Sequence, residues 1–265
     1  MKLGIYQFNP EWGQIENNLN RIESNLENHP DVDLWVLPEL CTTGYQFKSR
    51  QELKDLAEEF PGQQTSARIQ ALTSRLNAAI ILGVAEKSGS NLYNSAAIYE
   101  AGNFMGIYRK IHLFDQEKKY FDPGQDTPAV FELKGIQVGV MICFDWIFPE
   151  TARSLALQGA QLIAHSANLV LPYCQDAMVT RSIENHVFTA TANRFGTESR
   201  TEQTLTFTGM SQITDFKGTR LGQLSQNKEQ ILKVDIDPEQ ARQKSINDNN
   251  NLFHDRRTEL YSLDK

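Results

Sequence analysis

The chain has 265 residues, of which 40% are hydrophobic and 22% are charged, and its formal net charge is −7. This length and composition are typical of a globular protein with one sizeable core. The negative charge argues against a general nucleic-acid partner, because phosphate binding needs a basic face. No proline-, glycine- or serine-rich linker divides the sequence, so we expect a single domain over residues 1–265.

The sequence carries few signals for a membrane, a metal ion or a cofactor. No apolar run approaches the length of a membrane span, and residues 1–6 resemble a strand rather than a signal peptide. No cysteine or histidine pair has zinc-binding spacing, and no phosphate-binding loop appears. The three cysteines have no close spacing, which indicates reduced thiols. We therefore expect a cytoplasmic protein with no membrane partner, no metal and no cofactor.

The N-terminal part alternates between strand and helix patterns. An apolar strand over 33–37 runs into Glu39, and a carboxylate at the end of a buried run usually has a partner or a task. The other elements follow from the alternation or the helical spacing of apolar residues. We expect strands at 2–8, 79–85 and 93–99, and helices at about 15–26 and 63–76.

A lysine in an apolar setting comes next along the chain. Lys110 lies among the apolar and aromatic residues of the segment from Tyr108 to Gly124, which ends in the turn signal Asp122-Pro-Gly. Such a lysine can be a plain ion-pair partner or a side chain whose aliphatic stem packs on apolar surface. Its neighbour His112 is isolated from other histidines, and only its closeness to Lys110 sets it apart.

The segment before Cys143 has the pattern of a buried strand. Ile136, Val138, Val140 and Ile142 alternate with other residues, and the strand stops at Cys143. The dipeptide Pro149-Glu150 then opens a helix. A thiol at a strand-to-helix turn is well placed to be an exposed nucleophile. The alternative is a core cysteine, because free cysteine is among the most buried residue types.

The C-terminal part continues the alternation of strands and helices. We expect helices at 149–158 and 176–185, strands at 160–167 and 187–192, and a terminal hairpin of 205–214 with 229–235. This order favours two sheets covered by helices. Periodicity alone does not distinguish that arrangement from a doubly wound open sheet.

A carboxylate, an ammonium group and a thiol at strand ends are the parts needed for covalent acyl transfer. The thiolate of Cys143 attacks, the carboxylate of Glu39 takes the proton, and the ammonium group of Lys110 stabilises the oxyanion on the substrate. A nearby lysine also lowers the pKa of a thiol. Each residue alone has an ordinary structural explanation, but the three together indicate an enzyme.

Three motifs resemble those of the nitrilase, or carbon–nitrogen hydrolase, superfamily. They are Leu37-Pro-Glu-Leu40, Tyr108-Arg-Lys-Ile-His-Leu-Phe114, and the segment from Val138 through Cys143 to Glu150. The resemblance extends from Met1 to about Tyr261 and is closest to short, stand-alone bacterial and archaeal members. Further matches occur at Asn91–Ala96, Arg181–Asn185, Gly209–Ser211 and Asp255–Arg257.

The resemblance implies an α/β fold, a four-layer αββα sandwich of two mixed sheets flanked by helices. It implies a catalytic triad of Glu39, Lys110 and Cys143, with Glu117 as a second glutamate that holds the lysine. The alternative for Glu117 is a solvated charge beside two lysines. The backbone N–H of Phe144 would complete the oxyanion hole with Lys110.

Pocket lining and oligomeric state are also implied by the resemblance. Homodimers or higher homo-oligomers would form through the helix of Arg181–Asn185 and the segment near Asp255–Arg257, where Val187 and Phe188 look exposed. No cluster of arginines marks a carboxylate-binding pocket in the sequence. Arg181 and Arg194 are single candidates, and the resemblance places Arg181 on the dimer helix. The positions that resemble the pocket lining are Tyr45, Trp146, His165 and Asn168, with Phe148 beside Trp146 as an apolar wall.

These residues predict a hydrolase that cleaves non-peptide carbon–nitrogen bonds through a cysteine thioester. Its partners would be water and a small amide, and we favour small aliphatic amides, ω-amides among them. Hydrolysis of small aliphatic nitriles with the same triad is the close alternative. A non-catalytic binding or assembly module is a third reading, which the complete triad disfavours.

Overall fold

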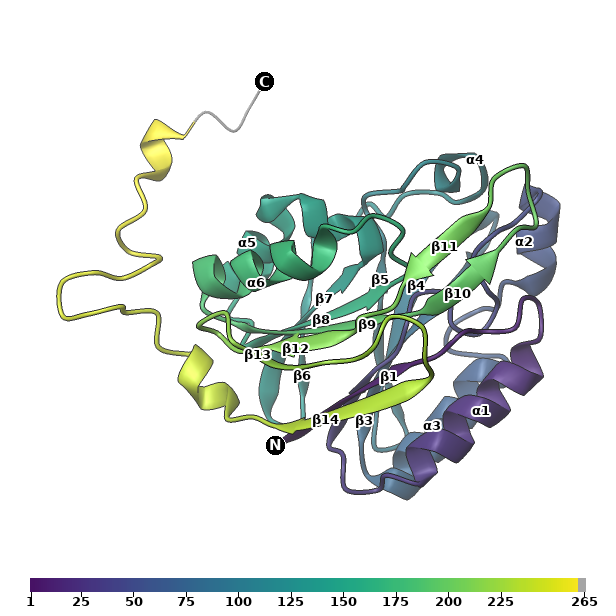
Figure 1. Ribbon diagram of the computed structural model, residues 1–265, viewed down its shortest axis with the longest axis horizontal. Coiled ribbons are helices and arrows are strands. Elements are labelled where there is room, and N and C mark those ends of the chain that lie inside the picture. The colour runs from purple at the N-terminus through teal and green to yellow at the C-terminus, as the bar shows by residue number, and fades with distance from the viewer. Residues whose placement is uncertain (262–265) are drawn as a thin grey trace.

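The computed structural model describes residues 1–261, so the last four residues of the predicted domain lie outside the described part. Within residues 1–261 the chain forms two six-stranded mixed sheets, with helices on their outer faces (Figure 1). No helix of this part is both long and apolar enough to cross a membrane.

The first sheet has the strand order β14-β1-β2-β3-β4-β5. Its centre, β1-β2-β3, is parallel, and the remaining pairs are antiparallel. Helices α1 (Ile15–Glu27) and α3 (Gln64–Leu76) pack on its outer face. The strands are β1 (Lys2–Gln7), β2 (Leu34–Val36), β3 (Ala79–Ser88), β4 (Asn91–Glu100), β5 (Asn103–Arg109) and β14 (Gln230–Asp235).

The second sheet has the order β13-β12-β9-β8-β7-β6 and again a parallel centre, β9-β8-β7. Its outer face is covered by α5 (Pro149–Leu157) and α6 (Cys174–Asn185). The strands are β6 (Val130–Leu133), β7 (Ile136–Ile142), β8 (Leu162–Ala167), β9 (Phe188–Asn193), β12 (Gln212–Thr214) and β13 (Arg220–Gln223).

The two sheets share one apolar core, which confirms the predicted four-layer αββα sandwich. Leu34 and Val36 of β2 face the second sheet and join the cluster that holds Val138 and Val140 of β7. Trp35, which lies between them in sequence, belongs to the cluster under α1 and α3. The period-2 alternation of a pleated strand therefore divides β2 between two cores. An open doubly wound sheet would lack the sheet-to-sheet core.

The predicted terminal hairpin is wrong. Residues 205–214 split into β11 (Leu205–Thr208), which pairs with β10 (Phe195–Glu198) in a separate two-stranded sheet, and β12 of the second sheet. Strand β14 pairs instead with β1, where Leu3 lies opposite Val234. Two antiparallel strands close in sequence suggest a hairpin, but β14 gains a longer ladder on the first sheet.

Some short elements have no counterpart among the predictions. Helices α2 (Arg50–Leu56) and α4 (Glu117–Tyr120) are brief, and the edge strands β5, β6 and β13 are largely polar or half exposed. Three 3₁₀ helices, η1 (Cys143–Ile147), η2 (Pro238–Ala241) and η3 (Thr258–Leu260), occur within the described residues. After η2 the chain runs away from the sandwich (Figure 1).

The interpretation of Val187 and Phe188 as exposed is also wrong. Both side chains are buried in the core of this chain, and the Phe188 ring meets that of Phe216 at 5.4 Å. The adjacent helix α6 instead presents Ile183, which is 50% exposed. Phe188 opens the inner strand β9 and Val187 directly precedes it, and an inner strand is covered on both faces.

Candidate active site

Glu39 lies three residues after β2 and is fully buried. Its Oε1 accepts hydrogen bonds from Lys110 Nζ at 2.7 Å and from Asn94 Nδ2 at 2.7 Å. Its Oε2 has no hydrogen-bond partner anywhere in residues 1–261. One oxygen is therefore fixed by two donors, and the other is available to a proton.

Lys110 follows the last residue of β5 and is buried between two carboxylates. Its Nζ donates to Glu39 at 2.7 Å and to Glu117 at 2.8 Å. Burial alone lowers the pKa of Lys110, but the Glu117 and Glu39 carboxylates outweigh it and hold the pKa above its usual range. Lys110 is therefore a fixed positive charge, as a group that stabilises an oxyanion must be.

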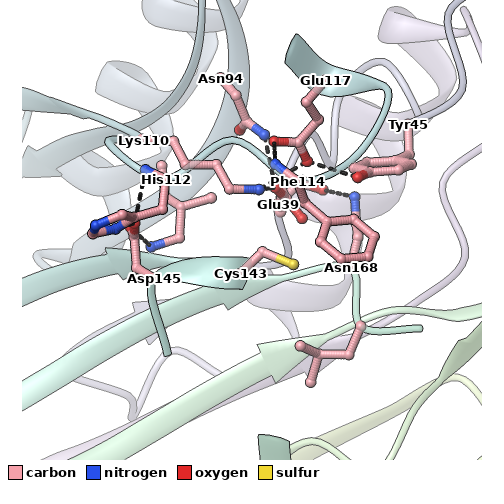
Figure 2. Close-up of polar contacts among 12 residues, drawn as sticks. Glu39, Tyr45, Asn94, Lys110, His112, Phe114, Glu117, Cys143, Asp145 and Asn168 are labelled. Carbon is pink, nitrogen blue, oxygen red and sulfur yellow. Dashed lines mark hydrogen bonds and ion pairs between the residues drawn. The ribbon is translucent and has the colours of Figure 1, made fainter. Parts of the chain in front are cut away.

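Glu117 begins helix α4 and joins the same network. Its Oε1 accepts from Lys110 and, at 2.6 Å, from the hydroxyl of Tyr45, and its Oε2 accepts from the Phe114 N–H at 3.0 Å. Burial raises the pKa of Glu117 despite the opposing effect of Lys110. Glu117 thus contacts Lys110, as expected, and is not a solvated surface charge. Figure 2 shows these side chains gathered around the lysine ammonium.

Cys143 opens η1 directly after β7, and its φ is +41°. A left-handed backbone is unfavourable for a residue with a Cβ, so the turn needs support. Asp145 supplies it, because its Oδ2 accepts from the Ile142 N–H at 2.9 Å and from the Tyr108 hydroxyl at 2.8 Å. Its Oδ1 lies 2.8 Å from His112 Nδ1. Asp145 therefore ties the lysine segment to the cysteine turn.

The Cys143 sulfur lies beside the charged ends of Glu39 and Lys110 (Figure 2). Burial and the Glu39 carboxylate raise the pKa of Cys143 well above its usual value, and Lys110 only partly opposes them. Lys110 lowers the pKa of Cys143, as the sequence predicted, but burial and Glu39 raise it by more. The resting side chain is a thiol, which needs a base in order to react.

His165 and Asn168 brace the backbone of the site. His165 Nε2 lies 2.9 Å from the Cys143 carbonyl oxygen, and burial lowers the pKa of this histidine. Asn168 Nδ2 donates to the Glu39 carbonyl oxygen at 2.9 Å. Trp146 is buried, and its carbonyl oxygen accepts from Arg181 Nε at 3.2 Å. Their predicted contact with substrate stays a prediction.

A cavity of about 670 Å³ opens onto this network. Tyr45, Phe114 and Glu117 belong to its wall, so the cavity reaches three residues of the hydrogen-bonded network, whereas Glu39, Lys110 and Cys143 are not among its lining residues. The wall mixes aromatic with polar and charged groups, and Trp146 and Phe148, the predicted apolar wall, are not among its residues. The other lining residues are Gln46, Phe47, Lys48, Asp115, Gln116, Lys119, Tyr120, Phe121, Arg200, Thr201, Glu202, Gln203 and Leu205.

Asn94 and Asp145 carry no predicted role in the sequence, although both lie within matched motifs. Asn94 is buried on β4, donates to Glu39 and accepts the Lys110 N–H on its backbone oxygen at 2.8 Å. The signal that could have revealed them is a polar side chain inside an otherwise buried segment. Such side chains are normally hydrogen-bonded, and here the partners are the triad residues and their neighbours.

Gly83 of β3 leaves the space that the Glu39 loop occupies. A Cβ at this position would lie 2.4 Å from Glu39 Cα and 2.6 Å from the Pro38 carbonyl oxygen.

We expect Gly83→Ala to lower the free energy of unfolding by about 1–3 kcal/mol and to lower kcat by displacing Glu39. Thermal melts and steady-state kinetics measure both effects. Gly139→Ala is the control. Its methyl group would lie 3.0 Å from the Leu155 side chain, which can move aside, so kcat should stay near the wild-type value.

The fold and the buried carboxylate–lysine–thiol cluster define a hydrolase of the nitrilase type. Residues 2–245 match the family model for carbon-nitrogen hydrolases, and the chain belongs to the carbon–nitrogen hydrolase family. The predictions of the family and of an enzyme are thereby confirmed.

Relatives of known name span the whole chain. A nitrilase from Pyrococcus abyssi is 43% identical over 263 residues, which cover 98% of this chain and 99% of that protein. The 2-oxoglutaramate amidase of Bacillus subtilis is 31% identical over 267 residues, 98% of either chain. The crystal structure of a carbon-nitrogen hydrolase from Helicobacter pylori superposes with a TM-score of 0.84 at 26% identity, covering 98% of this chain and 96% of that one.

Proposed function

We propose that this enzyme hydrolyses small aliphatic amides, ω-amides among them, to a carboxylic acid and ammonia through a thioester on Cys143. The observation that carries the proposal is the arrangement of Glu39. One of its oxygens is held by Lys110 and Asn94, the other has no hydrogen-bond partner within the described residues, and the Cys143 side chain points toward the same cluster.

Four steps follow from this arrangement. Glu39 removes the thiol proton as the Cys143 sulfur attacks the amide carbon, and Lys110 with the Phe144 N–H stabilises the oxyanion. The oxyanion collapses, the carbon–nitrogen bond breaks, and Glu39 gives its proton to the departing nitrogen, which leaves as ammonia. Glu39 then takes a proton from water as that water attacks the thioester. The second tetrahedral intermediate releases the carboxylic acid, and the proton returns to the sulfur.

The choice of amides rests on the cavity and on one relative. Polar and charged groups in the wall suit a substrate with a polar acyl chain, and the volume admits a chain of several atoms. The Bacillus subtilis relative is named 2-oxoglutaramate amidase, and its name supports an ω-amide. Small nitriles are the second candidate, because the relative with 43% identity is named a nitrilase.

Ammonia release from matched amides and nitriles, with chains of increasing length, tests the proposal. Faster release from amides supports it, and a maximum at an amide bearing a distal carboxylate supports the ω-amide class. Release from nitriles at an equal or greater rate would establish the nitrilase alternative. No release from either series, with folded protein, would contradict both.

We infer that the enzyme is a homodimer formed in part through α6. The supporting observation is Ile183, half exposed on this helix within the described chain. Light scattering should give a molar mass twice that of one chain, and Ile183→Glu should shift it to that of the monomer. Met105→Glu, on edge strand β5 of the other sheet, is the matched control and should leave the mass unchanged. A monomeric wild type would refute the inference.

The domain extent and the cellular location remain proposals. A single domain over 1–265 is supported by the family match over 2–245. The cytoplasmic setting is supported by Cys41, Cys143 and Cys174, which are buried free thiols.

A further inference from the structure

A buried ion pair lies behind one wall of the cavity that Tyr45 and Glu117 line. The connection between β10 and β11 supplies lining residues from Arg200 to Leu205, and Glu198 ends β10 just before it. The Glu198 carboxylate pairs with the guanidinium of Arg194. Arg194 is fully buried, and Glu198 is 7% exposed. Neither residue belongs to the predicted triad or to the second-glutamate position.

Glu198 also holds the loop that carries Tyr45. Its carboxylate accepts the backbone N–H of Gln46 at 2.7 Å and that of Tyr45 at 3.2 Å. Gly44 suits this crowded turn because it has no side chain and its φ is +86°. A Cβ on Gly44 would lie 2.7 Å from Trp12 Cδ1 and 3.2 Å from Glu198 Oε1.

Arg194 is held from several sides, so the pair is a fixed support. Its guanidinium lies 4.1 Å from the centre of the Phe207 ring and donates to the Asn9 side chain. The Phe207 ring in turn packs edge to face on the Tyr45 ring at 5.9 Å. The Tyr45 backbone and ring therefore both rest on the Arg194 assembly.

The far end of Tyr45 reaches the catalytic cluster. Its hydroxyl donates to Glu117 Oε1 at 2.6 Å, and the same oxygen accepts from Lys110 Nζ at 2.8 Å. Direct contacts thus run without a break from Arg194 through Glu198, the Tyr45 loop and Glu117 to Lys110. A buried ion pair is weak evidence for stability, because apolar residues of similar size often serve as well. An apolar pair, however, could not accept the backbone N–H groups of Tyr45 and Gln46, as the Glu198 carboxylate does.

We propose that Glu198, paired with Arg194, is a positioning residue for the hydrolysis. It fixes the Tyr45 loop so that the Tyr45 hydroxyl holds Glu117 against Lys110, which keeps the lysine ammonium where the oxyanion develops. This inference rests on the proposed function, since it assigns Glu198 a role in that reaction.

A double-mutant cycle of Glu198→Gln and Tyr45→Phe tests the proposal, because Tyr45→Phe removes only the hydroxyl that ends the chain of contacts. We expect Glu198→Gln to lower kcat about ten- to a hundredfold in the wild-type background, with a much smaller change in KM. In the Tyr45→Phe background the same substitution should lower kcat by less than about threefold, because the link is already broken. Equal losses in both backgrounds, or no loss in the wild type, would overturn the proposal.

A second substitution covers the case in which Glu198→Gln fails to fold. Replacing Arg194 and Glu198 together by methionine removes both charges and keeps an apolar filling, which is commonly tolerated. This double methionine variant should also lower kcat in the wild-type background and lower it much less in the Tyr45→Phe background. Glu23→Gln is the matched control, because Glu23 pairs with Arg68 at 2.7 Å on the helical layer, far from the cavity in sequence and fold. Its kcat should stay at the wild-type value.

The rate at which iodoacetamide alkylates Cys143 can be measured in the same double-mutant cycle of Glu198→Gln and Tyr45→Phe, and this measurement needs no substrate. Non-additive changes in that rate would support the positioning role even if the amide panel were silent, and additive changes would contradict it. Cys143-dependent amide hydrolysis with an additive Glu198→Gln effect would refute the positioning role alone. Amide hydrolysis that survives Cys143→Ala would refute the proposed function itself.

Discussion

Cys143→Ala should abolish turnover while the fold stays intact. The substitution removes the sulfur that forms the thioester in the proposed mechanism, and Cys41 and Cys174 make no hydrogen bond to Glu39 or Lys110 within the described residues. We expect kcat to fall at least about 10⁴-fold, as for other lost nucleophiles. The methyl group retains the Cβ at the φ of +41°, so the backbone meets no new strain. Ammonia release and a thermal melt of the variant are the measurements.

Cys174→Ala is the matched control for this result. Cys174 is also a buried free thiol, but it lies on α6 and outside the catalytic cluster. Its substitution should lower the melting temperature slightly and leave kcat near that of the wild type. Wild-type turnover in Cys143→Ala would contradict the covalent mechanism, and equal losses in both variants would point to a general effect of removing a buried thiol.

Glu39→Gln is expected to give the second-largest loss. Glutamine keeps the shape, and its amide oxygen can still accept from Lys110 and Asn94 in place of Oε1. Its NH₂ group would then occupy the position of Oε2, where it cannot take the thiol proton. Because the pKa of Cys143 is raised by burial, few molecules are thiolate without the base. We expect kcat to fall about 10²–10⁴-fold with KM little changed, as measured by steady-state kinetics.

Glu86 offers a carboxylate of similar burial as the control for Glu39. It lies on β3, is 2% exposed, and pairs with Arg109, the neighbour of Lys110. Glu86→Gln should lower stability, because it weakens a largely buried charge pair, and should leave kcat within severalfold. A loss in Glu86→Gln as large as that in Glu39→Gln would show that the effect is electrostatic and general, and the assignment of Glu39 as the base would fail.

Glu39 and Cys143 could be singled out from the sequence because each follows a strand with visible apolar residues. Strand β5 before Lys110 is largely half exposed and was not predicted, so the apolar setting and the motif around Lys110 marked this residue instead. The resemblance to the family then joined the three residues into one predicted cluster. The contact between Glu117 and Lys110 was within one local segment.

Features that depend on distant segments were not predictable in this way. The partner of β14 is β1, and nothing local to residues 230–235 indicates it. Val187 and Phe188 looked exposed because the sequence does not show that β9 is an inner strand. The link from Glu198 to Tyr45 joins residues 153 positions apart, and a single glutamate in a polar segment gives no signal for it.

Strand β14 also has a consequence for how the protein is made. It is the edge strand beside β1, so the sheet that carries Glu39 and Lys110 lacks this edge strand until residues 230–235 have left the ribosome. Contacts between segments so far apart are slow to form, because a long loop must close first. The nascent polypeptide therefore spends most of its synthesis with β1 unpaired on that side. An exposed β1 edge makes early release of truncated chains an aggregation hazard.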